Sequence, residues 1–242
     1  MTIRVAVVTS EDEDKFYINK AYIDFALLLG EYEDGVLIRP GIPNIVLNPS
    51  DIRNYDTLLL TGGRDINPMI FNRQNYNSNS IYTEMDLRWI SMVEEAVSNG
   101  LNIFGICRGF QLLAYMYFLE NNADIVRMTQ HINGHNQSDR SIQRKYTTHE
   151  VQNLTTNEVI KVNSMHHQAV TLLPKKIVGM DVIYHTTYRK IGDDTIIEGI
   201  KFKLGDSKIM GVQWHPEELT IEENKDILRE WNADDFLNYE IT

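Results

Sequence analysis

The chain has 242 residues, of which 43% are hydrophobic and 24% are charged. This length and balance are typical of a single α/β domain spanning residues 1–242 rather than of two small domains. The formal net charge is −11 and the basic residues form no dense run. The composition therefore argues against a nucleic-acid-binding protein, which needs a positive face to displace phosphate counterions.

The single cysteine, Cys107, excludes an intramolecular disulfide and favours a reducing compartment. The first residues run directly into a strand-like segment and lack the long apolar stretch of a signal peptide. No window approaches the roughly 20 apolar residues that a membrane-spanning helix needs. We therefore expect a cytoplasmic protein without a membrane segment.

Short apolar runs alternate with segments of helical periodicity through the first half of the chain. The runs predict strands at residues 3–9, 36–38, 56–61 and 101–106, and the periodicity predicts helices at 18–29, 86–97 and 110–119. Glycines and prolines follow most of these segments, as they do at element ends. This alternation predicts an α/β fold with a mostly parallel central sheet and helices on both faces.

The second half of the chain is less regular. Residues 129–148 are polar and lack periodicity, so we expect an exposed excursion over the sheet. Within it, His131 and His135 are spaced like metal ligands on a helix, but the segment lacks helical periodicity and a third ligand, so we predict no metal site. Further strands are expected at 159–162, 181–184, 195–202 and 208–214, and a closing helix at 221–231.

A Gly-x-Cys-x-Gly motif follows the predicted strand 101–106 and precedes a predicted helix. This arrangement is the cysteine form of the nucleophile elbow, a sharp turn that lifts a reactive side chain above the sheet. Gly105 and Gly109 fit this interpretation because side chains there would clash within the tight reversal. A lone cysteine is usually a core residue, but the glycines and the strand–turn–helix context favour Cys107 as a nucleophile.

A His-Pro-Glu run ends the predicted strand 208–214. Parallel strands present functional groups at their carboxyl ends, so this loop should emerge at the same edge as Cys107. His215 and Glu217 lie on either side of Pro216, which turns the chain, and their side chains can meet. The expected roles are His215 as general base and acid, and Glu217 as the group that orients it.

With both motifs identified, the sequence resembles class I glutamine amidotransferases, a family with a Cys-His-Glu triad, and in particular the γ-glutamyl-γ-aminobutyrate hydrolase branch, peptidase family C26. The resemblance implies the flavodoxin-like class I amidotransferase fold and hydrolysis of a γ-glutamyl amide through a thioester on Cys107, with no metal or other cofactor. The segments that carry the resemblance are 17–24 (YINKAYID), 61–68 (TGGRDINP), 105–111 (GICRGFQ), 162–170 (VNSMHHQAV) and 211–217 (GVQWHPE).

The resemblance also implies roles for other residues. Gly63, in the Gly62–Gly63 turn, and the amide of Arg108 would form the oxyanion hole. The γ-glutamyl group would be held by the remaining residues implied by the resemblance, which are Gly62, Gln111, His166, His167 and Gln168. After the elbow the chain lacks the glycine pair usual in the family, and residues 130–148 match no family segment, so the amine half of the substrate stays open.

Three alternatives to a free-standing hydrolase remain at this point. The chain could be a glutaminase subunit that supplies ammonia to a separate synthetase, although no synthetase segment is fused to it. It could be a non-enzymatic binding protein on the same scaffold, but such proteins usually lose the cysteine or the histidine. A serine-type hydrolase would place the acid before the histidine, whereas Glu217 follows His215.

Overall fold

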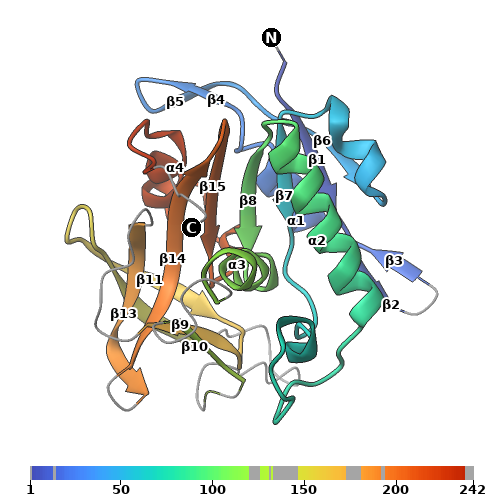
Figure 1. Ribbon diagram of the computed structural model, residues 1–242. Helices are drawn as coiled ribbons and strands as arrows, with labels where there is room; N and C mark the ends of the chain where they lie inside the picture. Colours follow the sequence, from blue (N-terminus) through green and yellow to red (C-terminus); the bar gives the residue numbers. More distant parts are fainter. Residues whose placement is uncertain are drawn as a thin grey trace.

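The computed structural model describes residues 2–12, 15–119, 126–130, 132, 147–172, 181–191 and 194–237. The centre of its main sheet is parallel, and Figure 1 shows these strands side by side. Hydrophobic residues fill them, which is typical of parallel strands covered on both faces. Their order is β15 (Ser207–Val212), β8 (Asn102–Ile106), β7 (Thr57–Leu60), β1 (Arg4–Val8) and β6 (Ile42–Val46).

An antiparallel extension continues the sheet beyond β15. It runs through β14 (Asp194–Leu204), β13 (Asp181–Ile191), β10 (Thr147–Asn153) and β11 (Val159–Ser164). Strand β12 (Ala169–Leu172) pairs with both β14 and β9 (Val126–Thr129). Two small hairpins stand outside this sheet, β2 (Ser10–Asp12) with β3 (Lys15–Tyr17) and β4 (Glu31–Glu33) with β5 (Val36–Arg39).

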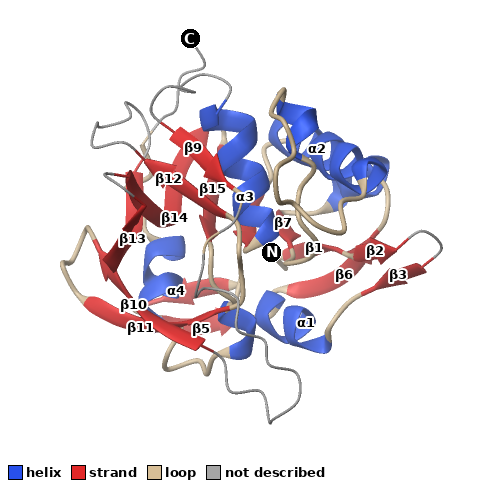
Figure 2. Ribbon diagram, turned by 90° about the horizontal axis from the view of Figure 1, so that it is seen from below, coloured by secondary structure: helices blue, strands red, loops and turns tan. Residues whose placement is uncertain are grey.

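Helices cover both faces of the parallel strands (Figure 2). Alternate residues of β1 divide between two core layers, with Val5 and Val7 in one and Ala6 and Val8 in the other, as the two-residue period of a strand requires. Helices α1 (Lys20–Ala26) and α4 (Lys225–Asn232) contribute to the first layer. The second contains α2 (Thr83–Ser98) and α3 (Arg108–Ala114), which continues as a π-helical turn, Tyr115–Leu119.

The predicted α/β fold, with a largely parallel centre and helices on both faces, is confirmed, and its antiparallel extension makes the sheet mixed. Short 3-10 turns, Pro49–Asn54, Pro68–Phe71 and Pro216–Glu218, connect the larger elements. None of the helices among the described residues is long and apolar enough to cross a membrane.

Several predicted elements differ from the observed ones. The strand expected at 36–38 is β5, which belongs to a hairpin, and the sheet instead takes β6, where Pro43 and Asn44 interrupt the apolar run. The closing helix begins at Lys225 rather than at residue 221. The strands expected at 181–184 and 195–202 are longer and pair antiparallel. His131 and His135 lie outside the described residues.

The elbow motif depends on two glycines that pack backbone against backbone. A Cβ atom added to Gly105 would lie 2.7 Å from the carbonyl carbon of Gly109, and one added to Gly109 would lie 2.5 Å from the carbonyl oxygen of Leu60. Both distances are far below van der Waals contact, and backbone atoms cannot move aside as a flexible side chain can. Strands β7 and β8 and helix α3 can therefore approach this closely only with glycine at these positions.

We predict that Gly109→Ala lowers the free energy of unfolding by about 3 kcal/mol or more, because the methyl group would force β7 and α3 apart. Gly205→Ala is the matched control: Gly205 has φ +58° and no atom within 4 Å of an added Cβ. That change carries only the left-handed backbone cost of about 1–2 kcal/mol. Urea denaturation of both variants measures the difference, and equal losses would contradict this account of the elbow.

Candidate functional site

Cys107 occupies a strained turn between β8 and α3. Its backbone has φ +48° and ψ −99°, a conformation that L residues rarely adopt. The turn is fixed by a hydrogen bond from the Cys107 amide to the Val212 carbonyl, 2.8 Å, and by one from the Gln111 amide to the Cys107 carbonyl, 3.0 Å. Such strain persists only where neighbouring structure enforces it, and it is common at functional sites.

His215 and Glu217 form a close pair just beyond the end of β15. The distance from His215 Nδ1 to Glu217 Oε1 is 2.7 Å. Asn163 holds the histidine backbone from both sides, because its side chain accepts from the His215 amide and donates to the His215 carbonyl, both at 2.8 Å. The loop that carries the histidine is therefore clamped to the end of β11.

The electrostatic environment of His215 favours its charged form. Burial alone lowers the pKa of His215, but the charges of Glu217 and Cys107, and hydrogen bonds to both, raise it well above its ordinary value. Since a carboxylate can only accept, Nδ1 must carry the proton shared with Glu217. His215 therefore presents a proton donor beside the thiol of Cys107.

The Gly62–Gly63 turn lies next to the histidine, because a Cβ added to Gly62 would lie 2.7 Å from His215 Cε1. The Gly62 amide donates to the Tyr22 hydroxyl, 3.1 Å, and the Gly62 carbonyl accepts from Ser10 Oγ, 2.9 Å. A Cβ added to Gly63 would lie 3.1 Å from Cδ of Arg108, so this turn and the residue after the cysteine are close neighbours.

Three glutamine side chains link the elbow to the antiparallel half of the sheet. Gln213 Nε2 donates to Cys107 Sγ at 3.5 Å. Gln111 Nε2 lies 3.1 Å from Gln213 Oε1 and 3.2 Å from the Gln168 carbonyl, and Gln168 Nε2 donates to Ser78 Oγ at 2.6 Å. All three side chains are almost completely buried. Amide groups that are held in this way form a rigid wall beside the thiol.

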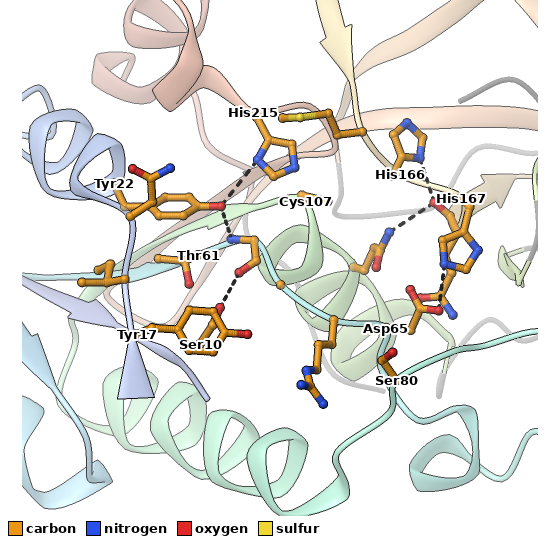
Figure 3. A pocket seen from close by; sticks show the side chains of 18 of the residues that line it. Ser10, Tyr17, Tyr22, Thr61, Asp65, Ser80, Cys107, His166, His167 and His215 are labelled. Atoms are coloured by element: carbon orange, nitrogen blue, oxygen red, sulfur yellow. Dashed lines mark hydrogen bonds and ion pairs between the residues drawn. The ribbon is translucent and has the colours of Figure 1, made fainter. Parts of the chain in front are cut away.

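Two histidines complete that wall, each beside a carboxylate. His166 Nδ1 lies 2.8 Å from the Gln168 carbonyl, and its Nε2 lies 4.0 Å from Oε1 of the fully buried Glu198. Burial lowers the pKa of His166, although Glu198 opposes this effect. His167 Nε2 lies 2.8 Å from Asp65 Oδ2. His167 and Asp65 are therefore oriented by one another at the far side of the wall (Figure 3).

Arg108 has its side chain on the other side of the elbow. The guanidinium is fully buried, forms an ion pair with Asp86 and lies 4.0 Å from the centre of the Trp89 ring. The Asp86 carboxylate also accepts from the Asn67 amide at 3.0 Å. This buried pair ties α3 to α2.

These residues surround a cavity of about 670 Å³. The predicted site residues that line it come from both halves of the sheet; they are Cys107, His215, Gly62, Gly63, Gln111, His166, His167 and Gln168. Glu217 is not among the lining residues and stands behind His215, and the Arg108 side chain is likewise outside the cavity. Among the described residues, no cluster of three or more His, Cys, Asp or Glu side chains could hold a metal ion.

Several residues of the site were not assigned a role from the sequence. Tyr22 and Gln213 lie within segments that resemble the family, but helical or strand periodicity gives such positions no signal of function. Asp65 and Asn163 also lie in those segments, and their partners, His167 and His215, are distant in the chain. Glu198 lies within the largely apolar strand β14, and a charged residue in such a strand was the one sequence feature that could have indicated a functional position.

The chain is similar to known proteins in sequence and in fold. Residues 9–217 match the family model of peptidase C26. Protein NtpR of Enterococcus hirae is 29% identical over 69% of this chain and 68% of its own. The γ-glutamyl-CDP-amidate hydrolase of Campylobacter jejuni is 27% identical over 72% of this chain and 68% of its own.

The fold has counterparts among solved structures. A glutamine amidotransferase from Thermotoga maritima has a TM-score of 0.51 and 16% identity, covering 97% of this chain and 87% of its own. At this level of identity the likeness concerns the fold alone. The family is shown by the model match, which spans more than half of the chain. The chain belongs to the peptidase C26 family, whose members resemble class I glutamine amidotransferases.

Proposed function

We propose that the protein hydrolyses a γ-glutamyl amide bond, with Cys107 as nucleophile, His215 as acid and base, and Glu217 as the group that orients His215. The observation that carries this proposal is the buried thiol on a strained turn beside an imidazole whose pKa is raised by a carboxylate at 2.7 Å. The relative named γ-glutamyl-CDP-amidate hydrolase supports a γ-glutamyl substrate. A free thiol nucleophile also fits a cytoplasmic enzyme.

In the first half of the reaction the Cys107 thiolate attacks the γ-carbonyl carbon. The carbonyl oxygen becomes an oxyanion, and the Gly63 and Arg108 amides, which belong to neighbouring segments, are the donors that we assign to it. The His215 imidazolium then protonates the departing amine as the C–N bond breaks. A γ-glutamyl thioester remains on Cys107.

In the second half water attacks the thioester. His215, now neutral, takes a proton from that water, and a second tetrahedral oxyanion forms in the same place. Its collapse breaks the C–S bond, releases glutamate and restores the thiolate–imidazolium pair. This sequence involves no metal ion or other cofactor.

The amide and histidine wall supplies the groups that we assign to the glutamyl moiety. Gln111, Gln168 and His166 are held by hydrogen bonds to one another, so they present a preorganised polar surface. The Asp65–His167 pair offers one carboxyl and one imidazole group for the α-amino and α-carboxylate ends. Gly62 lines the same cavity, and the absence of a side chain leaves room there for the glutamyl group that we assign to it.

We predict that Cys107→Ala reduces glutamate release to background with a panel of γ-glutamyl-amines and free glutamine, because no other thiol exists in the chain. The panel should contain neutral, carboxylated and phosphorylated amines. A coupled glutamate assay measures turnover, and mass spectrometry of acid-quenched wild type should find the γ-glutamyl adduct on Cys107. Turnover that persists in Cys107→Ala would refute the nucleophile.

The same panel separates the three candidate functions. Strong turnover of one γ-glutamyl-amine identifies a free-standing hydrolase and its leaving group. Weak activity that is confined to glutamine would identify a glutaminase subunit that supplies ammonia to a separate synthetase partner. Absence of Cys107-dependent release from every compound would favour a binding protein on this scaffold.

We predict that Glu217→Gln moves the alkaline limb of kcat/KM to lower pH by about one to three pH units. The Glu217 charge raises the pKa of His215, so its removal lets the imidazolium lose its proton at lower pH. The imidazolium is the form that protonates the amine during acylation, which kcat/KM reports. Glu222→Gln is the nearby control: its carboxylate is exposed, pairs with Lys225 and lies outside the cavity, so its alkaline limb should stay in place. A Glu217→Gln profile that matches wild type would contradict the assigned role.

A further inference from the structure

We infer that Tyr22 is a positioning residue that fixes the Gly62–Gly63 turn and the His215–Glu217 pair relative to one another. This inference rests on the proposed function. Tyr22 belongs to helix α1, which packs against the Pro216–Glu218 turn, and its phenol enters the cavity between that turn and the Gly62–Gly63 turn (Figure 3). The hydroxyl therefore lies between the Gly62–Gly63 turn and the His215–Glu217 pair.

The hydrogen-bond directions around the Tyr22 hydroxyl can be assigned. The Gly62 amide donates into Tyr22 Oη at 3.1 Å, which uses the hydroxyl as an acceptor. His215 Nδ1 is 3.5 Å from the same oxygen, but its proton is committed to Glu217 Oε1 at 2.7 Å. A protonated Nδ1 cannot accept. The Glu217 carboxylate raises the pKa of Tyr22 more than any other charged group does, so it is the acceptor that we assign to the Tyr22 proton.

The ionisation state of Tyr22 agrees with this assignment. Burial raises the pKa of Tyr22 well above its ordinary value, and the charges of Glu217 and Cys107 and a hydrogen bond to Glu217 raise it further. The hydrogen bond from Gly62 acts in the opposite direction without reversing the shift. The phenol therefore keeps its proton over the whole pH range of an activity assay and can always donate a hydrogen bond.

The Gly62 side of the contact is equally constrained. A Cβ added to Gly62 would lie 2.5 Å from Tyr22 Oη and 2.7 Å from His215 Cε1. The turn, the phenol and the imidazole are thus in mutual contact, and Ser10 Oγ holds the Gly62 carbonyl from the opposite side at 2.9 Å. Movement of this turn would also move the Gly63 amide that we assign to the oxyanion.

Two consequences follow for catalysis. Loss of the hydroxyl would leave the Gly62 amide without its hydrogen-bond acceptor and loosen the Gly62–Gly63 turn. The Gly63 amide would then stabilise the tetrahedral intermediate less well. Loss of the hydroxyl would also leave the Glu217 charge less compensated, so that Glu217 holds the His215 proton more strongly. Because Tyr22 acts through these groups and not on the substrate, removal of its hydroxyl should lower kcat and leave KM nearly unchanged.

The experiment compares Tyr22→Phe with Tyr32→Phe in the full chain, using the γ-glutamyl substrate that gives the highest wild-type turnover. Tyr32 is a matched control, because it packs against the same core layer as Tyr22 but lies outside the cavity. We expect Tyr22→Phe to lower kcat on the order of 10-fold to 100-fold with KM within about twofold of wild type. Tyr32→Phe should leave both constants unchanged.

The pH profile supplies a readout that a purely structural role would not move. We expect the alkaline limb of kcat/KM to move to higher pH in Tyr22→Phe, the direction opposite to that of Glu217→Gln. Thermal unfolding of each variant establishes that the folded fraction is unchanged at the assay temperature.

Three results would overturn the inference: wild-type kcat in Tyr22→Phe, an increase confined to KM, or an unmoved pH profile. An increase in KM alone would identify Tyr22 as a substrate contact instead. Failure of the proposed function itself has a different signature, since Cys107→Ala would then retain the activity of wild type. The two failures are therefore distinguishable within one set of variants.

Discussion

The site depends on one packing constraint, which is the contact between bare backbones at the elbow. Gly105 and Gly109 allow β7, β8 and the start of α3 to approach within distances that no side chain would permit. That proximity holds Cys107 at φ +48°, and the hydrogen bond from its amide to the Val212 carbonyl couples the turn to β15. Since β15 leads directly to His215, the position of the thiol also determines its distance from the imidazole.

Two buried acid–base pairs flank the elbow, and their surroundings give them different roles. Asp86 and Arg108 are both fully buried, and the guanidinium stacks on Trp89, so this pair ties two helices together without facing the cavity. Removal of either partner would leave an uncompensated charge in the core. His215 lines the cavity, and its partner Glu217 stands behind it. Of the two pairs, only the second therefore places an imidazole at the cavity, where the proposed proton transfer would take place.

The sequence predicted best those features whose cause is local. The elbow, the His-Pro-Glu turn and strands such as β7 and β8 are each specified by a few adjacent residues, and all appear near their expected positions. The edge strand of the sheet and the pairing of strands with one another were predicted less well. Strand β6 is half-exposed and contains Pro43, so its hydrophobic run is broken, whereas residues 36–38 form an equally apolar run that pairs only within a hairpin.

Long-range contacts could not be predicted because their partners share no local pattern. Glu198 and His166 belong to segments separated by two strands, and Tyr22 meets His215 across most of the chain. A sequence window can propose that a tyrosine faces the core, but the identity of its hydroxyl partner depends on how distant segments pack. The structure supplied these contacts, and with them the candidate role of Tyr22.

The mixed character of the sheet explains why the cavity has two chemically different sides. The parallel centre contributes the thiol and the Gly62–Gly63 turn at its carboxyl edge, where parallel strands gather functional groups. The segment between β11 and β12 contributes His166, His167 and Gln168, which face that edge. Gln213 joins the two sides, since it follows β15, contacts the thiol and accepts from Gln111. In the proposed reaction the groups on the parallel strands can thus stay fixed, while the opposite wall would determine which substrate is held against them.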